Sequence, residues 1–259
     1  MPVSEAAFDR YGGATICLTM ELAADHYLVI DAGTGIRAFQ QELPAGGPLH
    51  FSVLLSHYHW DHLLGLPFFR PLFDASNTFD FYGVEREGRS VEGGIAGVFQ
   101  PPWFPLPLRQ VPSIKTYFDL ANGNPFTIGD LTVRSVGLRH PQGVTAYRLE
   151  MDATSVVFAT DVERGDPDSD EALRKLAKGA DVLIHDAQYE PDEYDLHEGW
   201  GHSTWRHAVE AAEAAEVDRL ILVSHDPDRT DEKVDEIQEA AREKFPNTDA
   251  AYAGMEIPL

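Results

Sequence analysis

The sequence has little cysteine and little positive charge, and no hydrophobic run of membrane-spanning length. Its one cysteine, Cys17, excludes an intrachain disulfide and is expected to be a small, buried, apolar side chain. No apolar run reaches the roughly 20 residues that a bilayer requires. The first residues lack the basic and apolar regions of a secretory signal. We therefore expect a soluble, cytoplasmic protein with no membrane partner.

Basic residues are scarce: 20 Lys and Arg stand against 43 Asp and Glu, which gives a formal net charge of -23. Affinity for nucleic acid rests largely on Lys and Arg that neutralise phosphates, so this balance argues against nucleic acid as a partner. Each bound divalent ion would return two positive charges, so the count overstates the acidity if several aspartates ligate metal.

No repeat, low-complexity tract or linker divides the 259 residues, of which 43% are hydrophobic. A chain of this length and composition can bury one large core, so we predict a single domain over residues 1–259. The segment 85–118 is different, because its proline-rich part, residues 101–107, excludes a central strand or helix. We predict that this segment is an insertion, either a packing loop or a substrate lid.

Short apolar runs alternate with turns and helical segments, which predicts sheets covered by helices in the α/β class. The expected strands are Ala14–Leu22, His26–Ile30, Phe51–Leu55, Leu131–Val136, Thr145–Met151, Ser155–Ala159, Asp181–His185 and Arg219–Val223. The expected helices are Ile36–Glu42, Glu171–Lys178, Ser203–Ala215 and Asp231–Lys244, the last with a capping Asp.

Four potential metal ligands lie within six residues, directly after the expected strand Phe51–Leu55: His57, His59, Asp61 and His62. Imidazole and carboxylate are the usual ligands of zinc, manganese and non-haem iron. Two histidines at i and i+2 point to the same side of an extended chain, so they can converge on one ion. Such a cluster is not typical of a hydrophobic core, and it indicates a metal site.

Three further donors each follow an apolar run, where a strand end would present them: His140, Asp161 and His225. Taken alone, each is as consistent with a structural role as with metal binding. Taken with the cluster, they form a consistent ligand set.

This ordered set resembles the metallo-β-lactamase superfamily, and the similarity runs from Asp31-Ala32-Gly33-Thr34-Gly35 to Ser224-His225-Asp226-Pro227. The resemblance implies an αββα four-layer sandwich and two divalent metal ions, zinc first, with manganese or iron as alternatives. It implies that the first ion is held by His57, His59 and His140, and the second by Asp61, His62 and His225. Asp161 would bridge the two ions.

Two further segments narrow the branch. Leu183-Ile184-His185-Asp186-Ala187-Gln188 and Gly201-His202-Ser203-Thr204 resemble the His-Glu-Ala-Thr and His-Ser-Thr segments of tRNA 3′-processing endonucleases and related phosphodiesterases. The resemblance implies that Asp186 orients His202, which contacts the phosphate and protonates the leaving oxygen. Asp stands here in place of Glu, and Gln188 in place of Thr. Lactamase-type hydrolases generally lack this pair, so a phosphodiester substrate is favoured.

Two cations about 3.5–4 Å apart can share a water and lower its pKa towards neutrality. We expect the resulting hydroxide to attack phosphorus while Asp61 orients the nucleophile or accepts its proton. The chain lacks the long basic arm with which tRNA endonucleases grip tRNA. The leading prediction is therefore a hydrolase of a small or cyclic phosphodiester. Trp60, Trp103 and Phe104 could stack on a base or wall a pocket, although core packing is the more common role for any one of them.

Two alternatives stay open. The first is an RNA or tRNA 3′-end phosphodiesterase, which would need a basic groove. The second is a non-hydrolytic protein, either a di-iron redox protein or a sensor. Redox relatives usually carry Glu where this chain has His59. Homodimers are common among similar proteins, so a homodimer is a further expectation.

Overall fold

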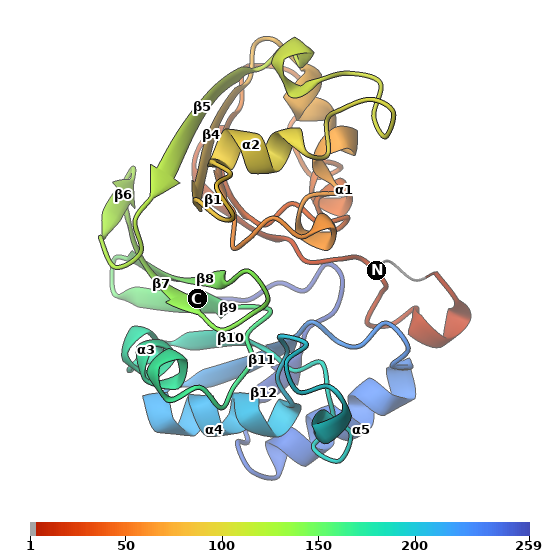
Figure 1. Cartoon of the computed structure of the whole chain (residues 1–259), viewed down its shortest axis with the longest axis vertical. Coiled ribbons are helices and arrows are strands. Elements are labelled where there is room, and N and C mark those ends of the chain that lie inside the picture. The colour runs from red at the N-terminus through yellow and green to blue at the C-terminus, as the bar shows by residue number, and fades with distance from the viewer. Residues whose placement is uncertain (1–3) are drawn as a thin grey trace. The chain divides into compact units, whose positions relative to one another are not determined.

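The computed structural model describes residues 4–259. They form two compact units, one from residues 14–121 and one from residues 4–13 together with 122–259. Each unit has its own β-sheet and its own hydrophobic core (Figure 1). The predicted α/β class with two sheets is confirmed.

The N-terminal unit is built on a five-stranded sheet in the order β1-β2-β3-β4-β5. Its strands are β1 (Leu18–Ala23), β2 (His26–Ile30), β3 (His50–Leu54), β4 (Thr78–Val84) and β5 (Ile114–Leu120). β1 and β2 form an antiparallel pair, and β2 to β5 are parallel. Its helices are α1 (Ile36–Phe39) and α2 (Val91–Ala96), with short 3-10 turns at Trp60–His62, Leu66–Phe68, Arg70–Phe73 and Leu108–Gln110.

Aromatic side chains dominate the core of this unit. In β4 alternate residues are buried, which places Phe79 and Phe81 on the face that α1 and α2 cover. Phe51 of β3 stacks on Phe79 with ring centroids 4.7 Å apart. Offset ring pairs of this kind add stability beyond the apolar area they bury.

The C-terminal unit is built on a seven-stranded sheet in the order β12-β11-β10-β9-β8-β7-β6. Its strands are β6 (Phe126–Ile128), β7 (Leu131–Leu138), β8 (Val144–Met151), β9 (Thr154–Ala159), β10 (Val182–Asp186), β11 (Arg219–Val223) and β12 (Thr248–Ala250). β6 to β9 pair antiparallel, whereas β9 to β12 are parallel. Its helices are α3 (Pro167–Ala177), α4 (Trp205–Ala215) and α5 (Asp231–Arg242), with 3-10 turns at Ala6–Phe8 and Tyr194–Leu196.

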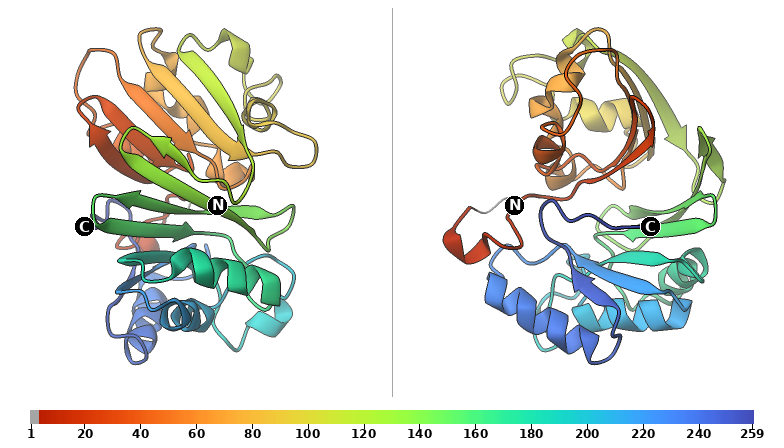
Figure 2. Two further views of the ribbon diagram at one scale, coloured as in Figure 1. Left: turned by 90° about the vertical axis from the view of Figure 1, so that its left-hand side faces the viewer. Right: turned by 180° about the vertical axis from the view of Figure 1, so that it is seen from behind.

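Each parallel connection in the second sheet passes through a helix, as a parallel crossover requires. Figure 2 shows α3, α4 and α5 along one side of this sheet. Helix α4 packs against the sheet through alanines, Ala208, Ala211, Ala212 and Ala215. Small side chains let the helix axis approach the strands closely, so this core is aliphatic and compact where the first is aromatic.

Most expected elements are present, with differences at helix ends, at the start of the first strand and in one segment. The strand expected over Ala14–Leu22 begins at Leu18. The helix expected over Ile36–Glu42 ends at Phe39. The expected capping residue of α5 is wrong: its N-cap is Thr230, and the Asp231 carboxylate instead accepts hydrogen bonds from the backbone N–H groups of Arg10 and Tyr11. Strand β4 was not expected, because Asp80 interrupts its apolar pattern.

Residues 85–118 are not all loop, since they contain α2 and most of β5. The proline-rich part, 101–107, has no helix or strand, as its composition predicts. Its role as a lid stays a prediction. Across residues 4–259, none of the helices combines the length and apolarity needed to cross a membrane.

Candidate metal centre

The predicted histidine cluster lies in the loop that follows β3, in the N-terminal unit. His57 and His62 are buried, and their ring centroids are 4.1 Å apart. The rings of His57 and His59 are 4.4 Å apart. An Asp61 carboxylate oxygen lies 3.7 Å from Nε2 of His62. Three imidazoles and a carboxylate therefore converge within one short loop, and this donor set suits zinc, manganese or iron.

A buried carboxylate, Asp31, fixes this loop. Asp31 follows β2, is fully buried, and accepts hydrogen bonds from Ser56 N at 2.8 Å and Ser56 Oγ at 2.7 Å. The Oδ2 atom that accepts from Ser56 Oγ also lies 2.8 Å from His62 Nδ1. Because the Ser56 hydroxyl donates to Asp31, its oxygen can accept from His57 Nδ1, which is 2.9 Å away. Protons on both Nδ1 atoms would leave the Nε2 lone pairs of His57 and His62 for a metal.

Two glycines allow the turn after β2 to meet the histidine loop. A Cβ on Gly33 would lie 2.4 Å from the Asp61 carbonyl oxygen, and one on Gly65 would lie 2.1 Å from the Gly33 carbonyl oxygen. Thr15 donates to the Asp61 carbonyl at 2.7 Å, which ties the loop down from the other side. Glycine is thus required at positions 33 and 65 by close backbone approach.

The C-terminal unit presents its candidate residues at strand ends. His140 follows β7, Asp161 follows β9, Asp186 ends β10, and His225 follows β11. Three of these strands are parallel, so their carboxyl ends lie at the same edge of the sheet, where α/β folds place their sites. One donor atom each of Asp161, Asp186 and His202 lies within 4.8 Å of the others.

Asp186 and His202 form a hydrogen-bonded pair. His202 Nδ1 lies 2.7 Å from Asp186 Oδ2, and Ser203 N donates to Asp186 Oδ1 at 2.7 Å. Asp186 is fully buried, and burial raises the pKa of its carboxyl group, while His202 acts to lower it. The 2.7 Å distance shows that the Asp186 side chain, one methylene shorter than Glu, is long enough to reach His202.

His140 and Asp161 are each held by neighbours within this unit. His140 Nδ1 donates to the Gly201 carbonyl at 2.7 Å, and its ring lies 5.5 Å from that of His202. The Thr160 hydroxyl donates to Asp161 at 2.7 Å, and the Ser224 hydroxyl does so at 3.2 Å. Asp161 and Ser224 both have positive φ, 51° and 59°, a conformation that non-glycine residues adopt infrequently and at a cost in free energy.

His225 is placed differently from the other candidates. It is absent from every group of three close donor atoms found within residues 4–259. Its Nε2 lies 3.2 Å from the Ala251 carbonyl, and its buried Nδ1 has no hydrogen-bond partner in the described chain. Burial lowers the pKa of His225 to about 4, so the ring is neutral at pH 7. A buried lone pair without a donor is what a metal ion would satisfy.

Sequence reasoning missed Glu163, which is almost fully buried two residues after Asp161. Its carboxylate accepts from Gly199 N at 2.7 Å and Gly201 N at 2.9 Å, and it pairs with Arg139 at 3.2 Å. Gly201 has φ +93°, and a Cβ there would lie 2.2 Å from His140 Nδ1. Glu163 thus holds the segment whose carbonyl orients His140. The only signal in the sequence is the pair of glycines around Trp200.

The aromatic residues that could stack on a base have different environments. Trp60 and Trp103 are exposed, whereas Phe104 packs against the core of the N-terminal unit, with its ring 5.3 Å from that of Phe99. Cys17 packs against the same core, and burial raises the pKa of its thiol.

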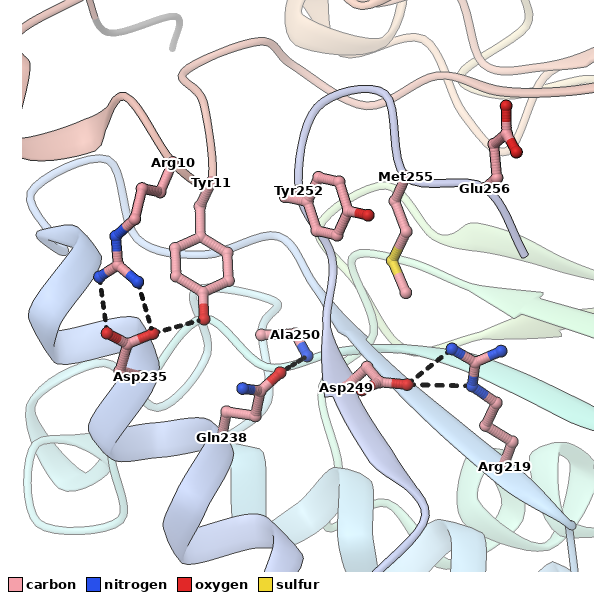
Figure 3. Close-up of a pocket in the computed structure, with 10 residues that line it drawn as sticks. All are labelled: Arg10, Tyr11, Arg219, Asp235, Gln238, Asp249, Ala250, Tyr252, Met255 and Glu256. Carbon is pink, nitrogen blue, oxygen red and sulfur yellow. Dashed lines mark hydrogen bonds and ion pairs between the residues drawn. The ribbon is translucent and has the colours of Figure 1, made fainter. Parts of the chain in front are cut away.

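A separate hollow of about 530 Å³ lies on the C-terminal unit, and none of the predicted site residues lines it (Figure 3). It lies beside the segment Arg10–Gly12, which we call the N-terminal hook. Four of the charged residues that line the hollow form two ion pairs, Arg10 with Asp235 and Arg219 with Asp249. The Tyr11 hydroxyl also donates to Asp235, at 2.8 Å. These contacts anchor the hook to α5 and indicate a structural role.

Comparison with known proteins places most of the chain in one family. The family model described as "Beta-lactamase superfamily domain" matches residues 26–225. A ribonuclease Z from Methanothermobacter thermautotrophicus is 45% identical over 95 residues, which cover 37% of this chain and 30% of that protein. The chain therefore aligns with only about a third of the length of such curated relatives.

Solved structures share the fold. The metallo-β-lactamase fold protein YhfI from Bacillus subtilis has a TM-score of 0.68 at 21% identity, covering 94% of this chain and 90% of that one. The short form of human tRNase Z has a TM-score of 0.68 at 18% identity, covering 100% and 97%.

The prediction that nucleic acid is an improbable partner is wrong. The curated relatives are named ribonuclease Z and a structural neighbour is a tRNase Z. The physical reason is that a net charge of -23 averages over the whole surface. A net charge does not report which charges line a particular site, or what metal ions would add there.

Proposed function

Because the chain belongs to the metallo-β-lactamase superfamily, we propose that it is a dinuclear metal-dependent hydrolase that cleaves phosphodiesters. The observation that carries the phosphodiester assignment is the pair formed by the buried Asp186 and His202, whose Nδ1 and Oδ2 atoms are 2.7 Å apart. This pair lies beside Asp161 in the C-terminal unit. It supplies an oriented proton donor next to candidate metal ligands.

The proposed ligands follow the order of the family. The first ion would be held by His57, His59 and His140, the second by Asp61, His62 and His225, with Asp161 bridging. The donor chemistry of both units fits, and so does the unpartnered buried Nδ1 of His225. Bound divalent ions would supply Lewis acidity and lower the pKa of a coordinated water. Zinc is the proposed metal, with manganese and iron as alternatives.

The chain's own residues would then position and move protons. Asp186 binds Nδ1 of His202, which fixes the ring and directs Nε2 at the substrate. A protonated His202 donates to the leaving oxygen, which is general acid catalysis. Asp61, whose side chain is partly exposed, orients the attacking water or accepts its proton.

Two substrate classes remain in the proposal. The first is a small or cyclic phosphodiester, supported by the absence of a long basic arm from the sequence. The second is the 3′ end of an RNA, supported by the relatives named ribonuclease Z.

A substrate panel tests the proposal. Metal-reconstituted protein is assayed on bis(p-nitrophenyl) phosphate, cyclic AMP, cyclic ribose phosphate, dinucleotides and precursor tRNA, with chelator-treated protein as the control. Turnover of at least one diester that chelation abolishes and metal restores supports the proposal. Redox-active iron with no turnover of any diester would support a non-hydrolytic function instead.

A further inference from the structure

Three aromatic rings lead from His202 to the surface of the C-terminal unit. Tyr189 meets His202 edge-on at 6.1 Å, His197 stacks on Tyr189 at 4.4 Å with an interplanar angle of 14°, and Trp200 meets His197 edge-on at 5.0 Å. Tyr189 is 2% exposed, whereas Trp200 is 62% exposed. We call Tyr189, His197 and Trp200 the aromatic ladder.

The outer end of the ladder is anchored. Glu163 accepts the backbone N–H groups of Gly199 and Gly201, the two residues that flank Trp200. Trp200 N donates to the His197 carbonyl at 3.0 Å, which closes a turn between the two outer rings. A large apolar ring is thus held out in solvent by a buried carboxylate, at a position only two residues before His202.

We propose that Trp200, supported by His197, is a stacking site for the nucleobase attached to the phosphate that His202 contacts. The inference rests on the proposed function, and it adds the substrate class. The substrate would be a phosphodiester that carries a nucleobase, and not a phosphodiester without a base. Indole and imidazole faces stack on any base, and such a contact needs no positive charge.

Calorimetric titration of the metal-loaded protein with adenosine 5′-monophosphate and with ribose 5-phosphate tests the site without turnover. The wild type should bind the adenosine compound more tightly. Trp200→Ala should weaken that binding by about 5- to 100-fold and leave ribose 5-phosphate unchanged. Trp200→Phe should restore most of the loss.

Leu196→Ala is the matched control, because Leu196 is a 79% exposed apolar residue of the same segment. It should leave both affinities unchanged. The inference is overturned if the adenosine compound does not bind, if both compounds bind equally, or if Leu196→Ala weakens binding as much as Trp200→Ala.

The outcome separates this site from the proposed function. If no diester is hydrolysed but base binding depends on Trp200, the stacking site is supported and the proposed diesterase activity is contradicted. If diesters are hydrolysed and Trp200→Ala changes nothing, the reverse holds. The same titration with an oligoribonucleotide identifies the source of the base. Tighter binding than the mononucleotide, lost in Trp200→Ala, points to an RNA end, and equal binding points to a small nucleotide.

Discussion

The two units hold their candidate ligands in different ways. The N-terminal unit places four donors in one loop after β3, and one buried residue, Asp31, binds both Ser56 and His62 of that loop. The C-terminal unit takes single residues from the ends of separate strands, and each has its own support, as Gly201 supports His140. In the local cluster one buried carboxylate contacts two residues of the loop at once, whereas the dispersed set divides its support among several contacts.

The largest expected effect in either unit is at His202, which belongs to the C-terminal unit and is not among the proposed ligands. His202→Ala should lower kcat by about 10²–10⁴-fold, because a general acid is lost. Both metals should be retained. Steady-state kinetics and metal analysis of the same preparation check this. Unchanged turnover would remove His202 from the mechanism, and loss of metal would make it a ligand.

A second, smaller effect is expected from the anchor of the N-terminal loop. Asp31→Asn should weaken metal binding by about 10–100-fold, since the residue that orients a ligand histidine is altered. Competition with a chromophoric chelator measures this affinity.

Asp80→Asn is the control for Asp31→Asn. Asp80 also pairs with a histidine of the same unit, with 2.8 Å between its Oδ2 and His50 Nε2, but His50 lies outside the ligand loop. Equal losses in the two variants would mean that Asp31 has no special role.

A third prediction concerns the dispersed support of the C-terminal unit. Glu163→Gln keeps one acceptor and loses the pairing of Arg139, so we expect kcat to fall by about 10-fold with little change in KM. Glu163→Asp should restore part of the rate if positioning is the cause. Glu171→Gln, an exposed ion-paired residue on α3, should behave as wild type. A loss confined to KM would contradict the positioning role.

The smallest expected effect is on acid stability. His185 in β10 is fully buried, and burial lowers its pKa from 6.5 to about 3. Below pH 6.5 the unfolded chain binds a proton that the folded chain does not, so stability is lost as the pH falls towards 3. The loss should be about 1 kcal/mol between pH 6.5 and pH 5.5. Urea unfolding across this range, compared with His185→Leu, checks it, and parallel slopes would exclude His185 as the cause.

The sequence was most informative where the chemistry is local. The metal site at His57 to His62 was predicted from spacing, and the family resemblance, which rested on the whole ordered set of donors, is confirmed. Strands such as His26–Ile30 were found because both faces are buried and the apolar run is continuous. Strand β4 was not predicted, because the residues on its outer face include Asp80 and Tyr82, which interrupt the apolar run.

Contacts between distant residues could not be predicted. Nothing in the sequence shows that the Glu163 side chain meets the Gly201 backbone, since the two residues are 38 positions apart. The net charge also led to a wrong prediction about nucleic acid, because a sum over the chain does not show where the charges lie. Residues 101–107 illustrate a third limit: proline excludes regular structure but does not specify the path that replaces it.

The N-terminal hook has a consequence for how the chain is made. Tyr11 binds Asp231 and accepts from Ala253 N at 2.8 Å, and Gly12 lies so close to Ala253 that a Cβ would be 2.7 Å from its methyl group. The hook is synthesised before the rest of its unit, yet its hydrogen-bond partner Asp231 follows Tyr11 by 220 residues. At typical synthesis rates it waits roughly 10–45 s for that partner. The hook is therefore among the last parts of its unit to dock.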